Sequence, residues 1–115
     1  VLLQNFAATG FAVLNGAYVR YCRIGPLVHG IYYIDGTSNA AAHTFTLPLP
    51  VSGTVGSLFL CPIAVYDNGA WQNDWGIAYG IADAVVATTY PHGIGSAWTN
   101  GATQEMGSFV YRAQV

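Results

Sequence analysis

Apolar and polar positions alternate along most of this chain, and no long segment repeats its apolar residues at the 3.6-residue period of a helix. Turn signals such as Asn15-Gly16, Gly25-Pro26 and Asp67-Asn68-Gly69 separate the strand-like runs. The pattern predicts loops at residues 35–39 and 91–107, and strands at residues 1–6, 11–14, 18–24, 27–34, 45–47, 55–60, 63–66, 76–81, 84–90 and 108–115. This spacing of turns is typical of an all-β protein, and we expect an antiparallel β-sandwich with a jelly-roll-like topology.

The predicted strand at residues 27–34 has two apolar faces. Alternation places Leu27, Ile31 and Tyr33 on one face, and Val28, Tyr32 and Ile34 on the other. In a two-layer sandwich only one face of each sheet meets the core. We therefore expect the second face to pack against a neighbouring sheet or a neighbouring chain.

The composition also favours contact with a neighbouring chain. The length fits a single domain over residues 1–115. Charged residues make up only 7% of the chain, against about 25% in an ordinary globular domain, while hydrophobic residues make up 53%. No apolar run approaches the ~20 residues of a spanning helix, so membrane insertion is not expected. The apolar surplus favours a subunit interface, because obligate interfaces resemble a domain core.

Charge and cysteine content narrow the possible partners and environment. A net charge of −2 argues against nucleic acid as a partner, because nucleic-acid binding requires a basic surface. The sequence begins with Val1 and lacks a signal-peptide pattern, so we expect a processed product or a fragment of a longer chain. Cys22 and Cys61 lie on separate apolar segments and are predicted to be buried and reduced, with a disulfide between them as the alternative.

Two stretches of the chain resemble a known family. The first, from Gly16 to Pro50, has an aromatic-Arg strand, Ile24-Gly25, an apolar strand from Leu27, a loop, and Thr-Phe-Thr-Leu-Pro. The second is the ending Gly-Ser-Phe-Val-Tyr-Arg at residues 107–112. Both resemble small β-sandwich domains at the tips of bacteriophage tail fibres and related virion fibres. The resemblance implies a homotrimer in the virion, an extracellular particle, where it contacts other virion proteins and a host cell-surface glycan or protein.

The segment at residues 66–75, YDNGAWQNDW, has the composition of a binding loop. Its aromatic rings offer rigid contact area, and its Asn and Gly residues offer adaptable hydrogen bonding. The predicted ligand-binding residues are Trp71, Asn73, Asp74 and Trp75, followed by Trp98 and Asn100 in the other long loop. The alternative is that the Trp side chains anchor their loops on the core or on a neighbouring subunit.

Residue spacing offers little for metal binding or catalysis. His29, His43 and His92 are far apart, and no His-x-His, HExxH or Cys-x-x-Cys motif is present, so we predict no metal and no other cofactor. His29 is interpreted as a hydrogen-bonded structural residue, with a shared metal site on a threefold axis as the alternative. Asp67 and Asp74 are interpreted as turn residues rather than as a Ca²⁺ site or a glycosidase pair, and no catalytic residue is predicted.

These features predict a non-enzymatic structural domain, the trimeric tip of a tail fibre, that is involved in recognising the host surface. One alternative is a capsid-decoration or fibre-capping protein without a receptor site. It differs from the first in whether the Trp loops face solvent. The other alternative is a fibre-borne enzyme that degrades polysaccharide, which would need a pair of carboxylates in a groove.

Overall fold

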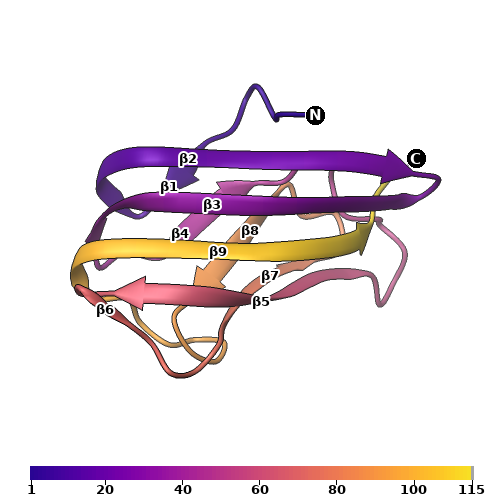
Figure 1. Ribbon diagram of the computed structural model, residues 1–115. Coiled ribbons are helices and arrows are strands. Elements are labelled where there is room, and N and C mark those ends of the chain that lie inside the picture. Colours follow the sequence, from indigo (N-terminus) through magenta and orange to yellow (C-terminus); the bar gives the residue numbers. More distant parts are fainter. Residues whose placement is uncertain (115) are drawn as a thin grey trace.

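The computed structural model describes residues 1–114, and within them the chain is all-β and antiparallel, without a helix (Figure 1). The strands are β1 (Ala8–Thr9), β2 (Phe11–Ile24), β3 (Leu27–Asn39), β4 (His43–Thr46), β5 (Leu58–Asp67), β6 (Ala70–Trp71), β7 (Gly76–Ile81), β8 (Val86–Tyr90) and β9 (Asn100–Arg112). They form one sheet in the order β1-β4-β8-β7-β5-β9-β3-β2, with β6 paired to β5. This sheet is bent until it is nearly closed into a barrel. The predicted all-β antiparallel class is confirmed.

Two layers of this bent sheet enclose the core. The long layer consists of β2, β3, β9 and the end of β5, and it lies in front in Figure 1. The short layer behind it consists of β1, β4, β8, β7 and the start of β5. Strand β5 belongs to both layers, because residues 58–63 pair with β7 and residues 64–66 pair with β9.

In the described residues, no helical segment has the length and apolar character needed to cross a bilayer.

Aromatic side chains from both layers fill the core. The rings of Tyr32 and Phe45 stack with their centroids 4.1 Å apart. Phe59 contacts both Phe109 and Tyr111 at a centroid distance of 5.2 Å. Fully burying a side chain such as Phe contributes about 1.5–3 kcal/mol, so this cluster supplies much of the stability of the fold.

One glycine of β3 makes room for this core. A Cβ atom on Gly30 would overlap Cζ of Phe109 and would lie 2.7 Å from the carbonyl oxygen of Arg20. The ring of Phe109 therefore occupies the space where a side chain of residue 30 would be. Gly30 and Phe109 also line a depression on the opposite, solvent-facing side of the layer, which is described below.

The strands of the long layer are longer than the sequence pattern predicted. Asn15-Gly16 is not a hairpin turn, because β2 continues through it with register shifts between Phe11 and Val13 and between Leu14 and Gly16. Residues 35–39 are not a loop but the end of β3, and they pair with the first residues of β9. The loop predicted at residues 91–107 therefore ends where β9 begins, at Asn100. In each case pairing with a neighbouring strand outweighs the local turn preference.

Smaller differences concern the ends of the chain and β5. Residues 1–6 form no regular strand, and only Leu2 makes an isolated bridge, to Arg20 of β2. Strand β5 is continuous through Pro62, close to the point where it passes from one layer to the other. The last predicted strand ends at Arg112, and the part of that prediction on Val115 lies outside the described residues.

Candidate functional site

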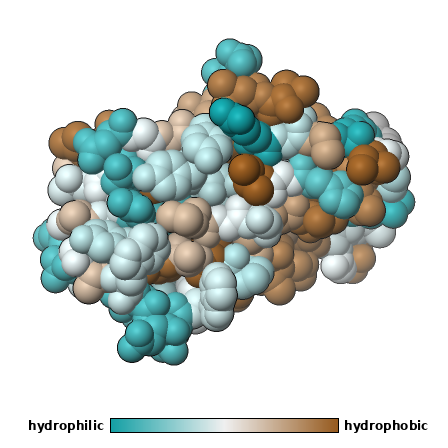
Figure 2. Space-filling view, viewed as in Figure 1, coloured by the Kyte–Doolittle hydropathy of each residue, from teal (hydrophilic) through white to brown (hydrophobic). Residues whose placement is uncertain are grey.

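The solvent-facing side of β2, β3, β9 and the adjoining part of β5, here called the outer face, is rich in exposed apolar side chains. Ile24 of β2 and Leu27 of β3 are cross-strand partners. Because side chains alternate between the two faces of a strand, Ile31 of β3 and Val110 of β9 also point outward. These four side chains are between 38% and 63% exposed. In Figure 2 brown hydrophobic groups lie in the middle and at the right of this face, among pale and teal groups. This is the second apolar face predicted for residues 27–34, and in the described chain no other segment covers it.

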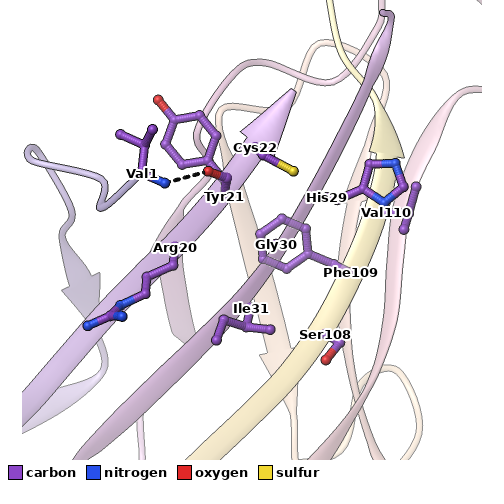
Figure 3. Close-up of a pocket in the computed structure, with 10 residues that line it drawn as sticks. All are labelled: Val1, Arg20, Tyr21, Cys22, His29, Gly30, Ile31, Ser108, Phe109 and Val110. Carbon is purple, nitrogen blue, oxygen red and sulfur yellow. Dashed lines mark hydrogen bonds between the residues drawn. The ribbon is translucent and has the colours of Figure 1, made fainter. Parts of the chain in front are cut away.

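Two adjoining depressions lie on the outer face. The first has a volume of about 540 Å³, and Figure 3 shows the side chains around it. The second, of about 490 Å³, extends toward the loop between β6 and β7. Ile31 and Ser108 line both depressions, so the two adjoin on β3 and β9.

The outer face becomes aromatic toward the beginning of β2. Tyr18 and Tyr33 are cross-strand partners with ring centroids 5.8 Å apart. The guanidinium carbon of Arg20 lies 5.3 Å from the centroid of the Tyr18 ring, a cation–π contact. Trp75 lines the second depression together with both tyrosines. The face therefore has an aliphatic end and an aromatic end.

The loop that carries Trp71 and Trp75, here called the Trp loop (residues 71–75), borders the aromatic end. Trp71 is 56% exposed and Trp75 is 69% exposed. The ring of Trp71 meets Tyr66 edge to face at 5.3 Å, and the backbone N–H of Gln72 donates to the Val65 carbonyl oxygen at 2.9 Å. A depression of about 170 Å³ is lined by four of the predicted binding residues, Trp71, Asn73, Asp74 and Trp75.

The other two predicted binding residues do not join this group. Trp98 is 4% exposed, its ring stacks on His43 with centroids 4.1 Å apart, and its Nε1–H donates to the Thr89 carbonyl oxygen at 2.8 Å. Trp98 is thus a core residue, which is the alternative given for the Trp side chains: this ring anchors its loop on the core rather than standing in an exposed patch. Asn100 is exposed, but it lies at the start of β9 opposite Asn39 rather than at the Trp loop.

A buried polar network, here called the His43 network, joins the two layers. Nδ1 of His43 lies 2.8 Å from Oε2 of Glu105, and Nε2 lies 3.0 Å from Oγ of Ser38. The hydroxyl of Tyr32 donates to Oε1 of Glu105 at 3.2 Å, and the N–H of Ala40 donates to Oγ of Ser38 at 3.1 Å. An imidazole with its proton on Nδ1 satisfies every one of these contacts. Burial raises the pKa of Tyr32 well above its usual value, and the adjacent carboxylate raises it further.

The order of contacts from Ser38 to His43 to Glu105 is that of a nucleophile, its base and an orienting carboxylate. The burial of Ser38 and His43 argues against a catalytic use of this arrangement. The imidazole is enclosed between the rings of Phe11 and Trp98, at centroid distances of 4.2 and 4.1 Å, and Ser38 is only 2% exposed. Neither the imidazole nor the hydroxyl is open to solvent in the folded chain. The network instead ties β4 of the short layer to β3 and β9 of the long layer.

The acidic loop residues have separate roles. Oδ1 of Asp67 accepts hydrogen bonds from the hydroxyl and the N–H of Thr99, at 2.8 and 3.4 Å. Asp67 is buried, whereas Asp74 is exposed on the Trp loop. These contacts agree with the interpretation of Asp67 as a structural turn residue. Within the described residues, no three His, Cys, Asp or Glu side chains are grouped closely enough to hold a metal ion.

The two cysteines are free thiols in different environments. Cys61 is buried and contacts the Ser108 carbonyl oxygen at 3.0 Å, and burial raises the pKa of its thiol to about 11. Cys22 is exposed, so the prediction that both are buried is wrong for this one. The reason is that Cys22 has the same alternation on β2 as Tyr18 and Arg20, which point outward.

Comparisons with protein-family models, curated proteins and solved structures found no match to this chain. The resemblance to virion-fibre tips accordingly stands on the short motifs quoted above. Of these, the stretch at residues 16–50 includes most of β2 and all of β3 and β4, and the stretch at residues 107–112 ends β9.

Proposed function

We propose that this chain is a non-enzymatic structural domain of a virion, the tip of a tail fibre, which takes part in recognising the host surface. In this proposal three copies of a jelly-roll-like sandwich assemble through the aliphatic end of the outer face. The Trp loop then contacts a host cell-surface glycan or protein. The observation that carries the proposal is the uncovered apolar outer face of the long layer.

The assembly is supported by the balance of apolar and charged side chains. Four large aliphatic residues of one sheet face are exposed on the single chain, and the whole sequence is only 7% charged. Contiguous apolar patches on a protein surface mark interaction sites. Closed symmetry is the usual way to cover such a patch with copies of the same chain. The number three comes from the resemblance to fibre tips.

The binding role is supported by the exposure of the Trp loop. Both Trp rings stand in solvent, yet the loop is held by the backbone bond from Gln72 to Val65. Preorganised aromatic side chains lose little conformational entropy on binding. Their position beside the aromatic end leaves the aliphatic end available for assembly. Three linked copies would raise the effective affinity through avidity.

The first test of assembly replaces Ile31, a residue in the middle of the outer face, by Asp. We expect the wild-type chain to be a trimer in light scattering at micromolar concentration. Ile31→Asp should dissociate it or prevent folding, because burying an unpaired carboxylate in an interface costs several kcal/mol. The control is Val55→Asp at a position that is 97% exposed, away from the long layer. A wild-type monomer, or an Ile31→Asp trimer as stable as the control, would contradict the assembly.

The test of recognition removes the two exposed Trp rings. Trp71→Ala and Trp75→Ala should each change the free energy of unfolding by no more than about 0.5 kcal/mol, as surface substitutions usually do. Attachment of the labelled trimer to host cells should weaken strongly, because each substitution occurs three times per assembly. Ile94→Ala, at an exposed aliphatic position in another loop, is the control and should leave attachment unchanged.

Other outcomes favour the alternatives. Normal stability with undiminished attachment of both Trp variants favours a capsid-decoration or fibre-capping protein. A polysaccharide-degrading enzyme receives less support from the geometry, because the Asp67 carboxylate already accepts two hydrogen bonds from Thr99. Release of reducing sugar from host polysaccharide by the wild-type protein would nevertheless overturn the non-enzymatic proposal.

A further inference from the structure

Two cross-strand rows of side chains run across the aromatic end of the outer face. The first row joins Tyr18 of β2, Tyr33 of β3, Met106 of β9 and Ala64 of β5. Cross-strand partners point to the same side of a sheet, so all four side chains face outward. Trp75 of the Trp loop lines the second depression together with this row. Three aromatic rings thus border one depression.

The second row lies two residues further along β3. It joins Asp35 to Gln104 of β9 and Tyr66 of β5. Tyr66 is in turn the partner of Trp71 in β6, so the row leads directly onto the Trp loop. At its other end the row stops at Gly16 of β2, where a Cβ atom would meet no neighbour within 4 Å. The Asp35 carboxylate is therefore not covered from that side.

The polar groups around these rows are open to a ligand. Within residues 1–114, four side chains next to the aromatic rings make no hydrogen bond: Asp35, Gln104, Asn73 and Asp74. Gln72, by contrast, donates from Nε2 to two backbone carbonyl oxygens and helps to hold the Trp loop. Strands β5 and β6 meet at the left of Figure 1, and the surface in that part of Figure 2 is mostly pale and teal. Aromatic rings therefore lie here among unpaired hydrogen-bonding groups.

This combination fits the chemistry of a saccharide. The C–H face of a pyranose ring packs on an aromatic ring, while its hydroxyls exchange hydrogen bonds with amide and carboxylate groups. Charge narrows the class, because Asp35 and Asp74 both present a carboxylate at this end of the face. Arg20 packs on the Tyr18 ring instead. An acidic sugar would meet two like charges, which disfavours its binding.

We propose that the two rows and the Trp loop form one binding site for an uncharged oligosaccharide. Trp75 and Tyr33 pack against its sugar rings, and Asp35, Gln104 and Asp74 bind its hydroxyls. The first row crosses four neighbouring strands, about 14 Å at the usual strand spacing, which accommodates more than one sugar unit. The inference rests on the proposed recognition role and narrows its ligand from a glycan or protein to an uncharged glycan. None of these five residues belongs to the aliphatic end assigned to assembly.

Calorimetric titration of the whole protein with soluble oligosaccharides tests the ligand class. The probes are hexasaccharides of glucose, mannose, galactose and N-acetylglucosamine, with oligogalacturonate and oligosialate as acidic counterparts. We expect saturable binding of at least one uncharged probe and no binding of either acidic probe. Failure of every uncharged probe to bind, or tighter binding of an acidic probe, would overturn the proposal.

Substitutions then locate the site, with the uncharged hexasaccharide that binds best as the probe. Trp75→Ala and Tyr33→Ala should each weaken binding by at least about tenfold, because a central aromatic contact contributes at least this much to an interface. Tyr79→Ala, which changes a half-buried tyrosine of β7 in the short layer, is the matched control and should bind like the wild type. Melting curves identify a variant that fails to fold, in which case the other decides. Wild-type affinity in a folded Trp75→Ala or Tyr33→Ala would contradict the site.

A double substitution tests the role of charge. Asp35→Asn with Asp74→Asn keeps an acceptor oxygen at both positions but removes both negative charges. The double variant should retain the uncharged probe and should acquire binding of oligogalacturonate. Continued rejection of both acidic probes would show that the carboxylates do not select the ligand, and the restriction to uncharged sugars would then be wrong.

Cell attachment separates this inference from the proposed function. An excess of the bound oligosaccharide should block attachment of the labelled protein to host cells. Attachment that depends on the Trp loop, resists the oligosaccharide and is abolished by protease treatment of the cells would keep the recognition role but overturn the saccharide. Oligosaccharide binding by a chain that neither assembles nor attaches would keep the site and overturn the proposed function.

Discussion

Replacing Glu105 by Ala is expected to lower the free energy of unfolding by about 3–5 kcal/mol, the usual cost of removing one member of a buried ion pair or charged network. Glu105 accepts hydrogen bonds from Nδ1 of His43 at 2.8 Å and from the hydroxyl of Tyr32 at 3.2 Å, and it is fully buried. Its removal leaves two buried donors without an acceptor. Because the network connects the two layers, the loss affects the whole fold.

Urea unfolding of a short variant series measures this effect. Glu105→Gln keeps the volume and one acceptor oxygen, so it should lose less than Glu105→Ala. His43→Leu combined with Glu105→Leu removes both polar partners and should lose less than the sum of the two single changes, because buried pairs replaced together by apolar residues are often tolerated. A loss below about 1 kcal/mol for Glu105→Ala would mean that the network contributes only what an ordinary hydrogen bond does.

Trp98→Ala is the second substitution with a large expected effect, again about 3–5 kcal/mol, because it leaves a cavity in the core. The ring stacks on His43 and its N–H donates to the Thr89 carbonyl oxygen, so both packing and a buried hydrogen bond are lost. Trp71→Ala offers the matched comparison, since it truncates the same residue type at an exposed position.

Thermal and urea unfolding of these two variants should therefore diverge. Trp98→Phe retains part of the stacking and should fall between wild type and Trp98→Ala. Trp98→Ala with wild-type stability would place this ring outside the core and return it to the candidate binding residues. A large loss in Trp71→Ala would instead indicate that this ring is packed, within the chain or between copies.

Much of the fold follows from local patterns. Alternation predicts the strands that contain Val19, Tyr32 and Ile34 in the core, and it also identifies the second apolar face of β3. The Trp loop is predictable for a similar reason, because its aromatic and amide residues are contiguous. Turn signals are less reliable. Asn15-Gly16 has a strong hairpin preference, but it lies inside β2, where pairing with β3 continues on both sides.

The contacts between distant residues were not predictable. Trp98 and Trp71 both lie in polar, glycine-containing stretches, and nothing nearby in the sequence shows that only Trp98 has His43 beneath it. The His43 network had no local signal, because β3, β4 and β9 meet only in the folded chain.

Side-chain alternation and composition are enough to establish that this protein is all-β, poor in charge, and apolar on more faces than one sheet can bury. Alternation depends only on neighbouring residues and composition only on the list of residues, so neither requires knowledge of the fold. The folded chain was needed to show which aromatic rings stay in solvent, how β5 joins the two layers, and that Ser38, His43 and Glu105 share one buried network. Those outcomes depend on which distant strands pair, and strand pairing is settled by packing of the whole core rather than by any local segment.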